Sequence, residues 1–273
     1  MPSQTDLFHR LHTAPEPLIL VNAWDAASAR VIERAGASAI ATTSAGIAWS
    51  LGYADGERMP AGELIAACAR ICRVSRVPVS VDLERGYGDS TQAVRDVAAA
   101  LIDLGVAGIN IEDGTRPGTR ELAPSEVLCE RIAAIRALDG RFFINARTDT
   151  HIVPWDDPAA RFEETLRRAT LCAAAGADGI FVPGLSSPEE IARLSRALAL
   201  PVNVYAGYAG APTAESLAQA GARRISLGCG PLQAALGLVG QLASEAFAQG
   251  RFDAMDERML SVGELNALFS SID

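Results

Sequence analysis

Three acidic residues follow apolar segments of the kind that form buried strands. Asp82 and Glu84 lie two positions apart in SVDLERGYGD, and Glu112 ends the apolar run GINIE. Alternation along a strand would place Asp82 and Glu84 on one face, and Glu112 would reach the same point from an adjacent strand. Carboxylates gathered in one place repel one another unless a cation lies between them. This pattern predicts a site for Mg²⁺ or Mn²⁺, which prefer oxygen ligands.

Arg147 ends another apolar run, FFINAR, and allows two interpretations. Its guanidinium either forms a salt bridge with one of the acids or clamps a carboxylate or phosphate of a substrate beside the metal. Asp113 and Asp89, which flank the candidate acids, are expected to pair with an arginine or to cap a helix. Asn203 is a further candidate to face the substrate.

The polar segment TTSAGIAWSLGYADGE, residues 42–57, is glycine-rich and is expected to be a long loop at the same end of the sheet. Asp55 within it either forms a turn or points back to the metal. The candidates for holding a second anionic oxygen are the Ser44 hydroxyl and the backbone N–H groups of Ala45, Gly46 and Ile47.

The composition excludes several kinds of chemistry. All 24 basic residues are arginine, so no lysine is present to form a Schiff base. The three histidines are too few for a typical zinc site. A net charge of −9 argues against nucleic acid and anionic lipid as partners. The five cysteines lack regular spacing, and no long apolar run opens the chain, so we expect reduced thiols in a cytoplasmic protein that spans no membrane.

Short apolar runs alternate with segments of helical period, and several helices end in a glycine followed by another apolar run. Eight such units predict a (β/α)₈ barrel formed by residues 1–273, with 250–273 as a C-terminal helical tail. An open, doubly wound sheet is the alternative, although no G-x-G-x-x-G follows the first strand. The expected strands are 18–24, 39–45, 77–84, 108–112, 142–149, 179–183, 201–205 and 224–228. The expected helices are 25–35, 60–73, 91–104, 125–138, 158–175, 188–197, 213–220 and 231–248, with one or two short helices in 252–273.

The segments that carry these residues resemble the isocitrate lyase and phosphoenolpyruvate mutase superfamily. They are LVNAWDAASARVIERAGASAIATTSAGIAWSLGYADGE, VPVSVDLERGYGD, GINIEDG and INARTD. The resemblance implies a barrel that assembles as a homotetramer, a dimer of dimers in which the last barrel helix is often exchanged. It also implies Mg²⁺ or Mn²⁺ near Asp82, Glu84 and Glu112, partly through waters, with Asp55 in support.

The resemblance further implies a small 2-oxo or 2-hydroxy acid as substrate. Its carboxylate would meet the backbone of residues 44–47 and the guanidinium of Arg147. The shared chemistry is a pyruvate-type enolate stabilised by the metal.

The sequence departs from the superfamily pattern in three places. Glu84 stands where the second metal acid is usually aspartate. The segment EDGTRPGTRELAPSE, which follows the fourth expected strand, has neither the lysine nor the proton-transferring cysteine of the K-[KR]-C-G-H loop of the lyases. Pro183 lies near the position where phosphorus-transferring members often carry a histidine. These departures disfavour cleavage of isocitrate or methylisocitrate by the usual acid, and they disfavour phosphonopyruvate chemistry.

The leading hypothesis is therefore a Mg²⁺-dependent carbon–carbon lyase of the decarboxylase type. It would act on a small 2-oxo or 2-hydroxy di- or tricarboxylate through a metal-stabilised enolate. The alternatives are a phosphonopyruvate or phosphoenolpyruvate mutase or hydrolase, an isocitrate- or methylisocitrate-type lyase with a replaced acid, and a catalytically weak 2-oxo acid binding protein.

Overall fold

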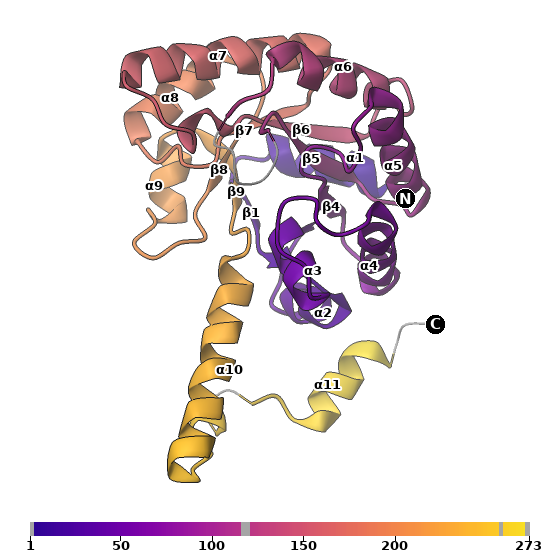
Figure 1. The fold of residues 1–273 in the computed structure, drawn as a ribbon, viewed down its shortest axis with the longest axis vertical. Helices are drawn as coiled ribbons and strands as arrows, with labels where there is room; N and C mark the ends of the chain where they lie inside the picture. Colours follow the sequence, from indigo (N-terminus) through magenta and orange to yellow (C-terminus); the bar gives the residue numbers. More distant parts are fainter. Residues whose placement is uncertain (1–2, 116–120, 257–258, 271–273) are drawn as a thin grey trace.

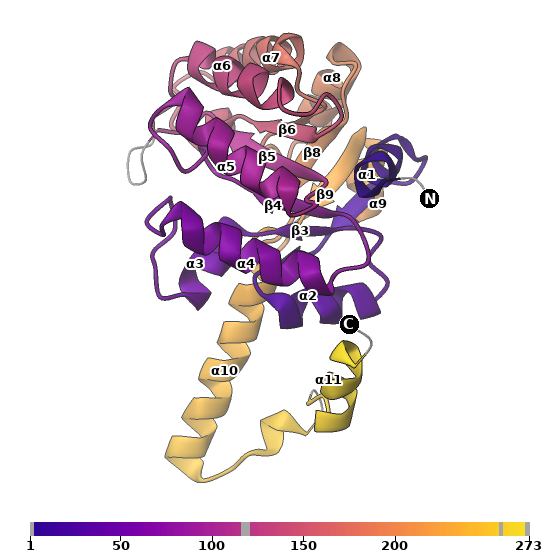
Figure 2. The same ribbon diagram turned by 90° about the vertical axis from the view of Figure 1, so that its right-hand side faces the viewer.

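A closed ring of parallel strands forms the centre of the molecule (Figures 1 and 2). The computed structural model describes residues 3–115, 121–256 and 259–270. β1 and β2 are two pieces of the first strand, interrupted at Val21; β1 pairs with β9 and β2 pairs with β3. Because the two ends of the strand order are pieces of one strand, the sheet closes and the predicted (β/α)₈ barrel is confirmed. The open-sheet alternative is wrong, since it would leave two edge strands unpaired.

The strands keep the predicted order along the chain and are mostly shorter than the apolar runs that predicted them. They are β1 (Leu18–Leu20), β2 (Asn22–Ala23), β3 (Ile40–Thr42), β4 (Val79–Asp82), β5 (Gly108–Glu112), β6 (Phe143–Arg147), β7 (Gly179–Phe181), β8 (Val202–Tyr205) and β9 (Ala222–Ser226).

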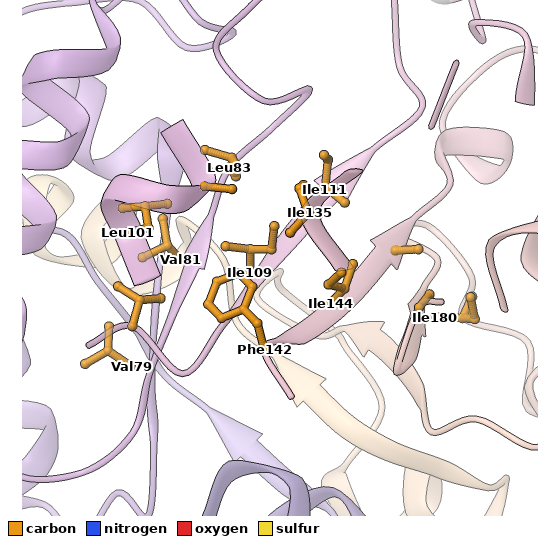
Figure 3. Close-up of a cluster of buried hydrophobic side chains, with 14 of the residues drawn as sticks. Val79, Val81, Leu83, Leu101, Ile109, Ile111, Ile135, Phe142, Ile144 and Ile180 are labelled. Carbon is orange, nitrogen blue, oxygen red and sulfur yellow. The ribbon is translucent and has the colours of Figure 1, made fainter. Parts of the chain in front are cut away.

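Alternation along these strands separates an apolar outer layer from a polar interior. Val81, Ile109 and Ile144 pack against the surrounding helices in the largest buried cluster (Figure 3). Polar residues alternate with these apolar ones along β5 and β6. Asn145 Nδ2 in β6 donates to Asn110 Oδ1 in the neighbouring β5 over 2.9 Å. The polar ends of the strands therefore lie above a buried layer of polar side chains inside the barrel.

A helix follows each strand of the ring. The expected helices are α2 (Ala26–Arg34), α4 (Ala61–Val74), α5 (Thr91–Asp103), α6 (Ser125–Arg136), α7 (Pro158–Ala175), α8 (Pro188–Ala197), α9 (Ala214–Gln219) and α10 (Gly230–Gln249). All of them except α10 cover the outside of the ring (Figures 1 and 2). Their starts follow local capping rules: Asp25 and Ser28 form a capping box at α2, and Ser187 caps α8 ahead of Pro188. None of these helices in the described part of the chain is long and apolar enough to cross a bilayer.

Two helices were not predicted. α1 (Gln4–Thr13) closes the amino-terminal end of the barrel, where its Phe8 and His12 pack against Phe143. α3 (Ser44–Ser50) occupies the segment expected to be a loop, so that expectation is wrong for its first half. Thr43 caps α3, and burial of Ile47 and neighbouring small side chains stabilises a helix that is too short to show a period in the sequence.

The C-terminal segment leaves the barrel. α10 projects away from it, then a short 3₁₀ turn, η2 (Asp253–Met255), and α11 (Val262–Phe269) lead back to α2 (Figures 1 and 2). Arg30 Nε in α2 donates to the Leu268 carbonyl over 2.9 Å. The expected short helices in the tail are thus confirmed. Apolar side chains of α10 remain in solvent, with Val239 59% and Phe247 90% exposed.

Candidate active site

Three charged residues end three consecutive strands at the carboxyl-terminal mouth of the barrel. Asp82 ends β4, Glu112 ends β5 and Arg147 ends β6. Glu112 and Arg147 are register partners, and Arg147 Nη1 lies 2.6 Å from Glu112 Oε2. The salt-bridge interpretation of Arg147 is therefore confirmed. Because βα loops build the active sites of such barrels at this end, the mouth is the candidate active site.

Asp82 is held by residues from the neighbouring strand and helix. Ser44 Oγ donates to Asp82 Oδ2 over 2.8 Å, and the Ser44 backbone N–H donates to the same oxygen over 3.3 Å. The Asp82 N–H donates to Thr42 Oγ1 over 3.0 Å. The other carboxylate oxygen, Asp82 Oδ1, is buried, and no group among the described residues forms a hydrogen bond with it. A buried anionic oxygen without a donor is costly, so this atom calls for a ligand from outside the chain.

Asp55 joins the site from the segment after α3. Loss of water around its carboxylate and the charge of Asp82 raise the pKa of Asp55, although its side chain keeps contact with solvent. The backbone N–H of Gly56 and the charge of Arg147 act in the opposite direction. Asp55 thus lies within the electrostatic reach of Asp82 and Arg147, and its catalytic role stays a prediction.

Glu84 reaches the site by a different route from the one predicted. β4 ends at Asp82, and Glu84 lies beyond it in a left-handed conformation with φ of 50°. Strand alternation therefore does not place it, and that part of the prediction is wrong. Its Oε1 accepts a hydrogen bond of 2.7 Å from the Tyr87 hydroxyl. Burial and the nearby charges of Asp82 and Asp55 raise the pKa of Glu84 to about 7, against the effect of the Tyr87 hydrogen bond.

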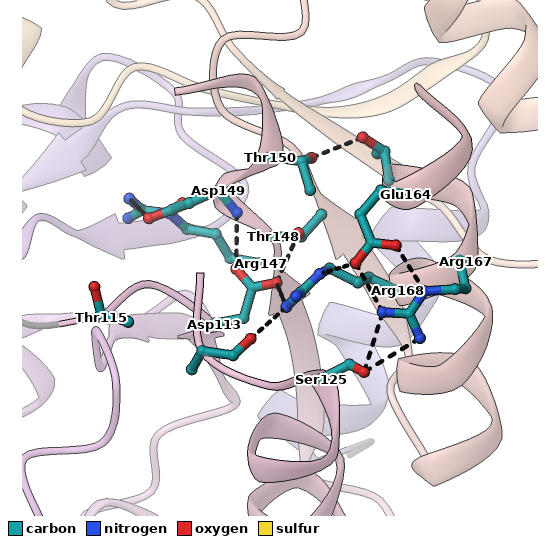
Figure 4. Close-up of polar contacts among 12 residues, drawn as sticks. Asp113, Thr115, Ser125, Arg147, Thr148, Asp149, Thr150, Glu164, Arg167 and Arg168 are labelled. Atoms are coloured by element: carbon teal, nitrogen blue, oxygen red, sulfur yellow. Dashed lines mark hydrogen bonds and ion pairs between the residues drawn. The ribbon is translucent and has the colours of Figure 1, made fainter. Parts of the chain in front are cut away.

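A second row of polar residues holds Arg147 (Figure 4). Arg147 Nε and Nη2 donate to Asp149 over 2.6 and 3.1 Å. Asp113 accepts hydrogen bonds from the Asp149 N–H at 2.9 Å and from the Thr148 hydroxyl at 2.7 Å. Arg168 Nη1 in α7 then pairs with Asp113 at 2.9 Å. The expected pairing of Asp113 with an arginine is confirmed, whereas the sequence offered no signal for Arg168.

The donor set suits a hydrated cation better than a directly chelated one. Among the residues that the structure describes, no three His, Cys, Asp or Glu side chains are arranged to bind one ion directly. Asp82, Glu84 and Glu112 each have a protein partner. Yet burial and neighbouring carboxylates raise the pKa of Glu112 well above its usual range, against the effect of Arg147. Mg²⁺ commonly keeps several waters and uses one or two carboxylates, so these residues fit it.

The candidates for substrate binding on α3 and β8 are buried, and several of their polar groups form hydrogen bonds within the chain. The Ile47 N–H donates to the Thr43 carbonyl over 3.0 Å, and the Gly46 N–H donates to Thr43 Oγ1 over 3.4 Å. Ala45 precedes Gly46 in the first turn of α3. Asn203 is buried in the barrel interior, where its Oδ1 accepts a hydrogen bond from Ser226 and its Nδ2 has no partner in the part of the chain that the structure describes. Contact of any of these groups with a substrate stays a prediction.

Residues 116–120, in the segment where the superfamily lyases carry their loop cysteine, lie outside the described residues. The described ends of this segment pair with each other through a bridge between Gly114 and Leu122.

Residues 8–247 match the family model of phosphoenolpyruvate phosphomutase. The chain belongs to the phosphoenolpyruvate phosphomutase family. An uncharacterized protein of Mycobacterium tuberculosis is 38% identical over 229 residues, which are 84% of each chain. A probable 2-methylisocitrate lyase of Corynebacterium glutamicum is 31% identical over 90% of this chain and 82% of its own. The crystal structure of a putative phosphonomutase from Burkholderia cenocepacia is 42% identical, has a TM-score of 0.83, and covers 88% of this chain and 99% of its own.

Members of this family and its superfamily are enzymes of small carboxylates. Those with a named activity include lyases of 2-methylisocitrate and decarboxylases of oxaloacetate. A phosphonopyruvate hydrolase that shares this fold binds oxalate and Mg²⁺ in its crystal structure.

Proposed function

We propose that this chain is a Mg²⁺- or Mn²⁺-dependent carbon–carbon lyase of the decarboxylase type. Its substrate would be a small 2-oxo or 2-hydroxy di- or tricarboxylate. The observation that carries the proposal is the set of charges at the barrel mouth: Asp82, Glu112 and Arg147 end consecutive strands, and the buried Asp82 Oδ1 has no partner in residues 3–115, 121–256 and 259–270.

The residues at the barrel mouth have two roles in the proposed reaction, holding the ion and orienting the substrate. Asp82, Glu84 and Glu112 hold the ion, in part through waters, and Asp55 adds negative charge at the mouth. Arg147 and the Ser44 end of α3, with Asn203 below, orient the substrate carboxylate. A divalent ion would supply positive charge that offsets the charge developing on the 2-oxo oxygen. In a 2-oxo substrate whose departing carboxylate is attached to the carbon next to the 2-oxo group, breaking that carbon–carbon bond releases CO₂ and leaves the electron pair as an enolate, and one proton from water completes the product.

The absence of lysine and of a cysteine in EDGTRPGTRELAPSE favours decarboxylation over cleavage of isocitrate. Decarboxylation needs a cation, a clamp and a proton source, and the proton can come from water. Cleavage of isocitrate or methylisocitrate needs a positioned acid, which the superfamily lyases take from that segment.

A substrate panel followed by NMR tests the proposal, with Mg²⁺ and with a chelator. The panel is oxaloacetate, isocitrate, 2-methylisocitrate, phosphonopyruvate and phosphoenolpyruvate. Pyruvate formed from oxaloacetate faster than with free Mg²⁺ alone is the expected result. Glyoxylate with succinate would instead mean that another residue replaces the loop cysteine. Line broadening of a 2-oxo acid without turnover would indicate a binding protein and would overturn the lyase proposal.

Phosphonopyruvate or phosphoenolpyruvate chemistry is the second candidate. The 42% identity to the putative phosphonomutase of Burkholderia cenocepacia favours it. Interconversion of phosphonopyruvate and phosphoenolpyruvate in the same panel, followed by ³¹P NMR, would replace the decarboxylase proposal with this one.

We also propose that the chain forms a homotetramer built from dimers that exchange α10. In a closed barrel each strand is followed by a helix that covers it, but α10 follows β9 and points away from the ring. The wall beside β1 is left open between α2 and α9, and Ile19 there is 46% exposed. An α10 from a second copy would cover this apolar groove of about 500 Å³ and bury its own apolar face.

A further inference from the structure

A left-handed backbone marks three residues beside the candidate site. Among the described residues, Glu57, Glu84 and Tyr87 are the non-glycine residues with positive φ, at 56°, 50° and 56°. Such conformations are unfavourable for residues with a side chain, and they persist where surrounding contacts enforce them. Glu84 and Tyr87 lie in one turn after β4, and Glu57 lies in an earlier segment of the chain.

Hydrogen bonds join these three residues into one chain. The Tyr87 N–H donates to Glu57 Oε1 over 2.9 Å, and the Tyr87 hydroxyl donates to Glu84 Oε1 over 2.7 Å. Arg85 Nη2 pairs with the other Glu57 oxygen. Glu57 thus anchors the backbone of Tyr87, and Tyr87 in turn holds the carboxylate of Glu84.

The turn between Glu84 and Tyr87 has little freedom to move. Gly86 has φ of 117°, and a Cβ at this position would lie 2.5 Å from a methyl group of Val94. Arg131 Nη1 donates to the Arg85 carbonyl over 2.7 Å. The Glu84 carbonyl accepts a hydrogen bond of 2.8 Å from the Glu112 N–H, which ties the turn to the next strand. The phenol of Tyr87 is therefore presented to Glu84 by a fixed backbone.

We propose that Tyr87 is a positioning residue that fixes the Glu84 carboxylate for the cation, an inference that rests on the proposed metal site. Glutamate has one more rotatable bond than aspartate, so its carboxylate needs an external constraint to keep one orientation. The hydroxyl engages Oε1 and leaves the second oxygen for the ion or for one of its waters. Removing an outer group that orients a metal ligand in this way typically weakens metal affinity by about 10- to 100-fold.

Mn²⁺ binding, measured by electron paramagnetic resonance of the free ion, tests the inference without relying on turnover. The measurement is made at pH 8.5, so that a change reports geometry rather than protonation of Glu84. We expect Tyr87→Phe to weaken Mn²⁺ binding about tenfold. Tyr53→Phe is the matched control, because Tyr53 also donates from its hydroxyl to a glutamate, Glu63, over 2.7 Å. It should bind Mn²⁺ as the unchanged protein does.

A double-mutant cycle separates positioning from general damage. Aspartate at position 84 is too short to keep the bond to the phenol, so Glu84→Asp should already weaken binding. Adding Tyr87→Phe to Glu84→Asp should then change the affinity by less than about twofold. Circular dichroism establishes that each variant is folded, and Tyr87→Leu, which also lacks the hydroxyl, tests the same bond if Tyr87→Phe does not fold.

Each negative outcome of these measurements contradicts a different part of the proposal. Equal Mn²⁺ affinity for Tyr87→Phe and the unchanged protein would overturn the positioning role and leave the metal site intact. An equal loss from Tyr87→Phe in both backgrounds would show that the phenol acts on something other than Glu84. If the unchanged protein bound no Mn²⁺, the proposed metal site itself would fail, and the role of Tyr87 with it.

Discussion

Arg147 binds two carboxylates at once: its Nη1 lies 2.6 Å from Glu112 Oε2 and its Nε lies 2.6 Å from Asp149 Oδ1. Burial lowers the pKa of Arg147, but the charges of Glu112 and Asp149 outweigh this and raise the pKa above its usual value. The guanidinium is thus charged at every working pH and is held rigidly at the barrel mouth. It is the permanent cation of a site that is otherwise crowded with carboxylates.

Arg147→Lys should lower turnover of the substrate about a hundredfold or more, because an ammonium group cannot reproduce a planar fork that serves several acceptors. Steady-state kinetics measure the loss. Arg141→Lys is the matched control, since Arg141 pairs with Asp6 on the surface with its side chain 70% exposed. A turnover of Arg147→Lys equal to that of Arg141→Lys would contradict the clamp.

Asp82→Ala should abolish Mg²⁺-dependent activity and leave the fold intact. The variant removes the buried oxygen that lacks a protein partner and the acceptor of the Ser44 hydroxyl. Loss of a metal-holding carboxylate should cost about a hundredfold or more in activity. Asp89→Ala, at an exposed position in the same segment, should keep full activity. Equal activity of the two variants would remove Asp82 from the site.

Arg168→Met should lower the free energy of unfolding by about 3 to 5 kcal/mol, because it leaves the buried carboxylate of Asp113 without its cation. Urea denaturation measures the change. Arg167→Met should cost less than about 1 kcal/mol, since the Arg167 side chain is half exposed. Combining Arg168→Met with Asp113→Asn should recover part of the loss. Equal effects at Arg168 and Arg167 would contradict the buried pair.

Buried His12 should make the protein less stable in acid. Burial and the charge of Arg224 lower the pKa of His12 to about 3, with a smaller contribution from His9. The unfolded chain takes up this proton near pH 6.5 and the folded protein does not. Stability is therefore complete above about pH 6.5 and falls by about 1.4 kcal/mol per pH unit on the way down to the folded-state pKa.

Urea denaturation between pH 7 and 4 measures this slope. His12→Phe keeps an aromatic ring stacked on Phe143 and removes the titration, so its stability should fall less steeply with pH. His9→Gln is the control for the neighbouring, more exposed histidine. Parallel curves for His12→Phe and the unchanged protein would contradict the assignment.

Exchange of α10 predicts that the chain is a tetramer in solution. Light scattering after gel filtration measures its mass. Val239→Asp places a charge on the exposed apolar face of α10 and should reduce the assembly to smaller species. Leu171→Asp, on the exposed side of α7, should keep the tetramer. A monomeric unchanged protein would contradict the assembly and would leave the site chemistry untouched.

The sequence alone determined the parts of the fold that depend on local pattern. β5 was predicted at its observed bounds, Gly108–Glu112, because a glycine and an acid enclose a short apolar run. The eight repeated units predicted the barrel, because a parallel sheet of eight strands leaves no unpaired edge strand when it closes. The same alternation placed Asp82, Glu112 and Arg147 at strand ends. α1 and α3 were not predicted because each is short, and its apolar face can be recognised only from its packing against the barrel.

Only the tertiary structure decided which charges meet. Asp113 was expected to find an arginine, but the chain has 24 of them, and the approach of α7 to the end of β5 selects Arg168. The position of Glu84 depends on a left-handed turn that Glu57 and Tyr87 hold from another segment. The periodicity of the sequence determines which side of a helix or strand a residue occupies. The partner of a buried charge depends instead on which groups the tertiary structure buries beside it, because a charge removed from water needs a partner.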